Sequence, residues 1–134
     1  MTHLGWFRII VIAAGLMGAA GVILGAVAAH TADGGRLALS ASSMLSLHAP
    51  AAMLAVLLAD RQIVRPRIGL LAAGGFVAGA TLFGADMMVR QFLGHHLFPR
   101  AAPTGGTLMI LSWFLLAIAA VLPRAASRSD RSGS

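Results

Sequence analysis

The chain has no cysteine, no lysine and no glutamate, and only 10% of its 134 residues are charged. Without cysteine, disulfides, thiolate catalysis and cysteine-ligated metals are excluded. The sequence also lacks a set of nucleophile, base and acid, a phosphate-binding glycine loop and a metal-ligand motif. We therefore do not expect an enzyme, and we assign no metal and no cofactor.

Apolar residues make up most of the chain: 58% of it is hydrophobic and the mean hydropathy is +0.86. A soluble domain of this length could not bury so much apolar surface, because small domains keep a large fraction of their surface exposed. Lipid is therefore the expected surrounding. The net charge of +6 comes from ten arginines at the edges of apolar runs. This pattern is typical of membrane flanks, and we expect no nucleic-acid partner.

Four apolar segments predict an all-α, integral membrane four-helix bundle with short loops. The helices are expected at about residues 7–29, 40–59, 68–89 and 104–122, each near the roughly 20 residues that a bilayer requires. They form a single domain, 1–122, followed by a disordered polar tail, 123–134. A signal peptide is the alternative for the first segment, because Ala26-Val27-Ala28 has the form of a cleavage site.

The arginines also predict an orientation. Seven lie in the N-terminal lead, the middle loop and the tail (Arg8, Arg61, Arg65, Arg67, Arg124, Arg128 and Arg131), and three lie in the other two loops (Arg36, Arg90 and Arg100). Because cytoplasmic loops are enriched in arginine and lysine, both termini are expected in the cytoplasm. The expected location is the bacterial inner (plasma) membrane.

Small residues at helical spacing indicate which faces pack together, because helices in lipid associate through close approach rather than hydrophobic burial. The first helix has Gly18, Gly21 and Gly25 on one side, and the third has Gly75 and Gly79. The second helix has a stripe of alanines. In the fourth helix, one face is expected to contain Gly106, Met109, Trp113, Ala117 and Ala120.

Two ionisable residues inside the spans, His48 and Asp86, lie on these packing faces, so both are expected to point into the bundle. Intramembrane charge is costly and usually has a partner or a function. We expect the two to meet near the outer side, together with His30. The simpler alternatives are an Asp86–Arg90 ion pair four residues apart and a His48 hydrogen bond to a carbonyl, including one freed by Pro50.

The segment Thr104-Gly105-Gly106 completes this candidate polar site. If Thr104 caps the last helix, the amides of Gly105 and Gly106 are free at the positive end of the helix dipole. They would then bind the Asp86 carboxylate or an anionic ligand. For the remaining candidates the simpler interpretations are a helix-end role for His30, an interfacial position for His95 and His96, and a core position for Trp113.

Several short motifs in a fixed order resemble a known family: GAVAAH (25–30), His48-Ala49, LFGAD (82–86), APTGG (102–106) and Trp113. The chain resembles the bacterial membrane family catalogued as domain of unknown function 423, which is similar to the eukaryotic transmembrane protein 256 group. The resemblance spans about residues 15–121. It implies a small four-helix membrane protein with no established activity or cofactor. Leu47 and Asp86 depart from many members, which have an aromatic and a small hydroxyl residue there.

The leading functional expectation is a structural or accessory inner-membrane protein, either a homo-oligomer or a small subunit of a larger membrane complex. Membrane lipid is the one partner that the composition requires. The alternatives are a small-molecule or proton-coupled transporter that uses Asp86 and His48, and a haem- or quinone-binding redox subunit with His30 and His48 as axial ligands.

Overall fold

The computed structural model describes residues 3–32 and 35–122, and this part of the chain forms four long α-helices. They are α1 (His3–Ala29), α2 (Arg36–Asp60), α3 (Pro66–Leu93) and α4 (Ala101–Val121). With 21–28 residues each, they are about 32–42 Å long at about 1.5 Å per residue, which exceeds a bilayer core of about 30 Å. All four are apolar enough to cross a membrane, so this is a multi-pass, all-α membrane protein.

The helices begin earlier than the apolar pattern indicates, at residues 3, 36, 66 and 101 instead of 7, 40, 68 and 104. Arg36, Arg67 and Ala101 are good helix formers, so the helices continue past the end of each apolar run. Pro66 occupies the first turn of α3, where its missing N–H has no helical partner to lose. The predicted tail, 123–134, lies outside the described residues.

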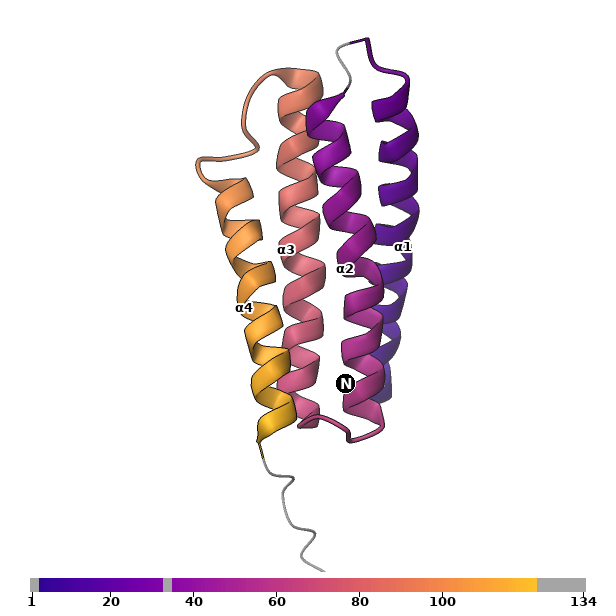
Figure 1. Cartoon of the computed structure of the whole chain (residues 1–134), viewed down its shortest axis with the longest axis vertical. Helices are drawn as coiled ribbons and strands as arrows, with labels where there is room; N and C mark the ends of the chain where they lie inside the picture. The colour runs from indigo at the N-terminus through magenta and orange to yellow at the C-terminus, as the bar shows by residue number, and fades with distance from the viewer. Residues whose placement is uncertain (1–2, 33–34, 123–134) are drawn as a thin grey trace, which may run out of the picture.

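The four helices run alternately up and down as successive hairpins (Figure 1). The central pair is α2 and α3; α1 packs mainly on α2, and α4 packs on α3. The contact between α1 and α3 is slight, so a cleft separates these two helices. The start of α1 and the end of α4 lie at the same end of the bundle as the 61–65 loop, whose Arg65 N–H donates to the Ala119 carbonyl at 2.9 Å. We call this the inner end, and the opposite one the outer end.

Glycines bring the helix backbones together at two interfaces. Between α3 and α4, a Cβ on Gly79 would lie 2.7 Å from the Gly105 carbonyl oxygen, and one on Gly105 would lie 2.6 Å from the Gly79 carbonyl oxygen. Between α1 and α2, Gly21 contacts Ser46, and its carbonyl accepts a 2.6 Å hydrogen bond from the Ser42 hydroxyl. Small residues therefore set the helix spacing, as expected where lipid supplies no hydrophobic drive.

The packing glycines predicted on α1 and α3 all lie against a neighbouring helix. On α4 the predicted Met109 is buried, but the rest of the predicted face is shifted by one residue. Its buried residues are Ala101, Ala102, Gly105, Met109, Ser112 and Ala119. Gly106 has no neighbour within 4 Å of where its Cβ would be, and Trp113 is 44% exposed. The shift arises because either of the adjacent residues Gly105 and Gly106 could face α3. Gly105 does so, because it and Gly79 approach each other closely.

Candidate functional site

His48 lies on the buried face of α2 with both ring nitrogens occupied. Its Nδ1 is 2.8 Å from the Met44 carbonyl oxygen, and its Nε2 accepts a 3.3 Å hydrogen bond from Trp113 Nε1 on α4. The indole is only a donor, so Nε2 is the acceptor and the proton is on Nδ1, which donates to Met44. The simpler alternative, a His48 hydrogen bond to a carbonyl, is confirmed, but the carbonyl is that of Met44 and not that of Ser46, which Pro50 frees.

Phe76 of α3 packs against both His48 and Trp113. The Phe76 ring centroid is 5.6 Å from that of His48 and 4.7 Å from that of Trp113, the latter in an edge-to-face arrangement. Such pairs contribute about 0.5–1.5 kcal/mol beyond their buried area. The sequence analysis did not identify Phe76, although it lies between Gly75 and Gly79, the two glycines assigned to the packing face of α3. This His48 cluster joins α2, α3 and α4 and leaves no ring nitrogen free for a ligand.

Asp86 is fully buried near the outer end of α3, and its partners come from the loop that follows the helix. Its Oδ1 accepts a 2.8 Å hydrogen bond from the Leu97 backbone N–H. His96 Nδ1 lies 3.5 Å from Oδ2, and Oδ2 has no hydrogen-bond partner within the described residues. The His96 side chain is 57% exposed, so the carboxylate lies one side chain below the outer surface.

The chain reaches Asp86 by folding back over the end of α3. Gly94 ends the helix in the left-handed conformation, with φ of 75°. The loop then places Leu97 above Asp86, eleven residues earlier in the chain, and continues to Arg100, which has φ of 67°. The 94–100 loop is thus anchored to α3 through one buried carboxylate.

The predicted partners of Asp86 are therefore wrong. Across the described ranges, the basic side chain within 4 Å of the Asp86 carboxylate is that of His96 and not that of Arg90. Thr104 does not cap α4 either: it lies in the first turn, where its hydroxyl donates to the Arg100 carbonyl at 2.8 Å. Pro103 is accommodated in this first turn because its missing N–H has no helical partner there, which lets α4 begin at Ala101. Gly105 and Gly106 are consequently helical residues rather than a free pair of cap amides.

The structure also separates the other members of the predicted polar site. His48 is level with Phe76, and Asp86 is ten residues further along α3, so the two lie about 15 Å apart along the bundle. His30 is exposed at the outer end of α1. It is twelve residues, or about 18 Å, beyond Gly18, which faces Ala49 next to His48. The residues therefore do not fit a haem with His30 and His48 as its two axial ligands.

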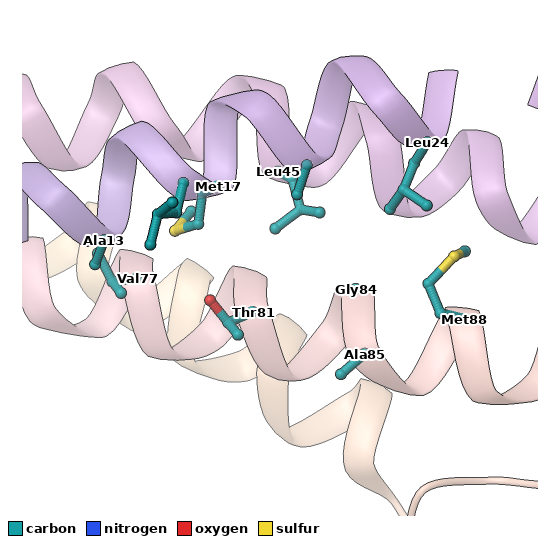
Figure 2. A pocket seen from close by; sticks show the side chains of 11 residues that line it. Ala13, Met17, Leu24, Leu45, Val77, Thr81, Gly84, Ala85 and Met88 are labelled. Atoms are coloured by element: carbon teal, nitrogen blue, oxygen red, sulfur yellow. The ribbon is translucent and has the colours of Figure 1, made fainter. Parts of the chain in front are cut away.

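Two apolar grooves lie along the cleft between α1 and α3, and sequence reasoning did not anticipate them. The outer groove has a volume of about 540 Å³, and Figure 2 shows Met17 and Leu24 facing Thr81 and Met88, with Leu45 of α2 between the two helices. The inner groove has a volume of about 630 Å³. Neither His48 nor Asp86 lines these grooves. The two polar residues and the two cavities are thus separate features of the fold.

Comparison with known proteins gives a family but no activity. The family described as protein of unknown function (DUF423) matches residues 24–106, from the end of α1 to the start of α4. This range includes His48, Phe76 and Asp86. No curated protein and no solved structure matches the chain.

Proposed function

Since the chain belongs to the DUF423 family, which has no assigned activity, we propose that it is a structural or accessory protein of the bacterial inner membrane. It acts by associating with another membrane-embedded surface, either a second copy or a larger complex, and not by chemistry at a polar site. The observation that carries this proposal is the hydrogen bonding of the two buried ionisable residues, His48 and Asp86. Both form hydrogen bonds with groups of the chain itself, His48 through its two ring nitrogens and Asp86 through Oδ1, and they lie at separate depths.

The outer helices provide the surface for association. Only 22% of the most apolar window of α1 and of α4 is buried, against 44% for α2 and 39% for α3. The exposed side chains include Leu16 and Val22 on α1 and Phe114 on α4. Charge supports the proposed orientation. The inner end, where α1 begins and α4 ends, also has four arginines: Arg8, Arg61, Arg65 and Arg67. This enrichment is typical of the cytoplasmic side.

The absence of cysteine makes this proposal directly testable. Single substitutions Leu16→Cys on α1 and Phe114→Cys on α4 introduce one thiol on each outer face, while Ala72→Cys, at a fully buried position, is the matched control. After mild oxidation in native membranes, we expect a disulfide-linked dimer or a cross-linked partner from one outer face and none from Ala72→Cys. The proposal would be contradicted if the wild-type protein purifies in mild detergent as a monomer without a second protein and neither outer-face cysteine variant forms a cross-link.

A proton-coupled carrier is the second candidate, and the free Oδ2 of Asp86 is the observation that favours it. This oxygen is buried, lacks a hydrogen bond within the described residues and lies beside the exposed His96. A carrier that used Asp86 and His48 as one site has no geometric support, because about 15 Å separates them along the bundle. Asp86→Asn should abolish proton-driven flux in proteoliposomes if this candidate is right, and unchanged flux would eliminate it.

A further inference from the structure

We propose that the inner groove between α1 and α3 is a binding site for one anionic phospholipid of the inner leaflet. Arg67 binds the lipid phosphate, and the acyl chain lies along α3 over Gly74 and Ala78. The proposal goes beyond the association proposed above and does not depend on it.

The lining of the groove matches a lipid in polarity. It is formed by two residues of α1 and six of α3, and Arg67 is the charged one among them: Trp6, Ile10, Arg67, Leu70, Leu71, Gly74, Gly75 and Ala78. The volume of about 630 Å³ is in the range of small-molecule sites, about 300–1,000 Å³. One end therefore offers a cation, and the rest offers apolar surface.

The depth of the groove matches a single leaflet. From Arg67 to Ala78 is eleven residues of α3, or about 16 Å, and half of a bilayer core is about 15 Å. Arg67 and Trp6 lie at the inner mouth, the level at which arginine and tryptophan contact headgroups. The groove thus extends from the membrane surface to about the midplane.

The charge at the mouth selects an anionic occupant. Of the residues that the structure describes, none forms an ion pair with Arg67, and Arg8, Arg61 and Arg65 lie at the same end. A guanidinium can bind a phosphate through two parallel hydrogen bonds, and basic sites between membrane helices bind anionic headgroups. A second copy of the chain fits less well, because its own Arg8 and Arg67 would come to the same depth and repel these cations.

Gly74 keeps the groove open. A Cβ placed on Gly74 would have no neighbour within 4 Å, so a larger side chain at this position would extend into the groove. Gly74→Leu should therefore fill the groove without disturbing helix packing. Gly106 on α4 is equally open but lies away from the groove, so Gly106→Leu is the matched control.

Trp6 provides the signal for the test, because only one other tryptophan occurs in the chain. A Trp113→Phe protein, whose helix content is checked by circular dichroism, is placed in phosphatidylcholine vesicles. The vesicles contain a small fraction of a brominated lipid, either phosphatidylglycerol or phosphatidylcholine. In each, the bromine atoms are on the part of the acyl chain nearest the headgroup. We expect the brominated phosphatidylglycerol to bind next to Trp6 about fivefold more strongly than the brominated phosphatidylcholine, the preference expected from one arginine.

Variants separate a specific site from general attraction to the basic end. Gly74→Leu and Arg67→Gln should remove the preference, whereas Gly106→Leu and Arg61→Gln, which loses the same charge outside the groove, should keep it. Equal quenching by both lipids, or an equal loss in Arg61→Gln, would show only annular lipid and overturn the proposal. Wild-type protein with Trp113 intact gives an independent measurement. In native mass spectrometry, the wild-type protein should retain one phosphatidylglycerol molecule, and Gly74→Leu should lose it. If the wild-type protein instead retains a second copy of the chain, and Gly74→Leu dissociates this dimer, the proposal is also refuted.

Discussion

Gly79 should tolerate a methyl group far less well than Gly74, although both are interior glycines of the same helix. A Cβ on Gly79 would lie 2.7 Å from the Gly105 carbonyl oxygen and 2.9 Å from Met109 Cγ. The carbonyl belongs to the backbone of α4, so it cannot rotate away as a side chain would. The two helices must therefore separate at this point, and the Met109 side chain must also repack. Gly74→Ala meets no atom within 4 Å.

The expected magnitude follows from this difference. Replacing glycine by alanine inside a helix favours folding by about 0.8–1 kcal/mol, and this gain is common to both variants. Forcing extra volume into a packed interface costs about 1–3 kcal/mol. Gly74→Ala should therefore be neutral or stabilising by up to about 1 kcal/mol. Gly79→Ala should be less stable than Gly74→Ala by about 1–3 kcal/mol.

The measurement is reversible unfolding in mixed detergent, with all variants in a Trp6→Phe background. It is followed by helix circular dichroism and by the fluorescence of Trp113, which loses its contact with Phe76 when α4 detaches. Gly105→Ala is the reciprocal variant, with its Cβ 2.6 Å from the Gly79 carbonyl oxygen, and should resemble Gly79→Ala. If Gly79→Ala and Gly74→Ala unfold at the same denaturant concentration, the close approach of α3 and α4 does not limit stability, and the reasoning fails.

Two further predictions concern the polar contacts. Asp86→Ala removes the acceptor of the hydrogen bond from the Leu97 N–H, at a cost of about 0.5–1.5 kcal/mol. Amide exchange across the 94–100 loop should accelerate in Asp86→Ala, whereas Asp86→Asn, which keeps Oδ1, should stay close to wild type; equal protection in all three proteins would disprove the anchor. Ser42→Ala removes the hydrogen bond to Gly21 and should destabilise the α1–α2 pair by about 0.6 kcal/mol in unfolding measurements. Ser43→Ala, which loses only an exposed bond within α2, is the control and should have no effect; a similar loss in both would argue against an interhelical role.

The spans and most packing glycines could be predicted from the sequence because they depend on local, periodic properties. Apolar length identifies a bilayer-spanning helix, and Gly75 and Gly79 recur at the spacing of one helix face. The face of α4 could not be assigned in the same way. Gly105 and Gly106 are the same residue type at adjacent positions, so local sequence does not indicate which one faces α3. Only the contact with the neighbouring helix distinguishes them.

The partner of Asp86 illustrates the limit of spacing rules for a site. Periodicity correctly placed the carboxylate inside the bundle, and the four-residue rule then indicated Arg90. In the structure, the carboxylate instead accepts a hydrogen bond from the backbone N–H of Leu97. It depends on a chain reversal between two left-handed residues, Gly94 and the non-glycine Arg100. A positive φ at an arginine is not a preference of that residue, so no sequence pattern could have predicted this loop.

The succession of hairpins in Figure 1 has a consequence for how the protein is made. Its extensive helix contacts are between α1 and α2, α2 and α3, and α3 and α4, which are consecutive in the chain. A topology of this kind has a low contact order, so little loop-closure entropy opposes each pairing step. Each helix can dock on the one synthesised just before it, while the ribosome is still adding residues. Assembly can thus proceed from the N-terminus at the pace of translation, without a long-range step that must await the last helix.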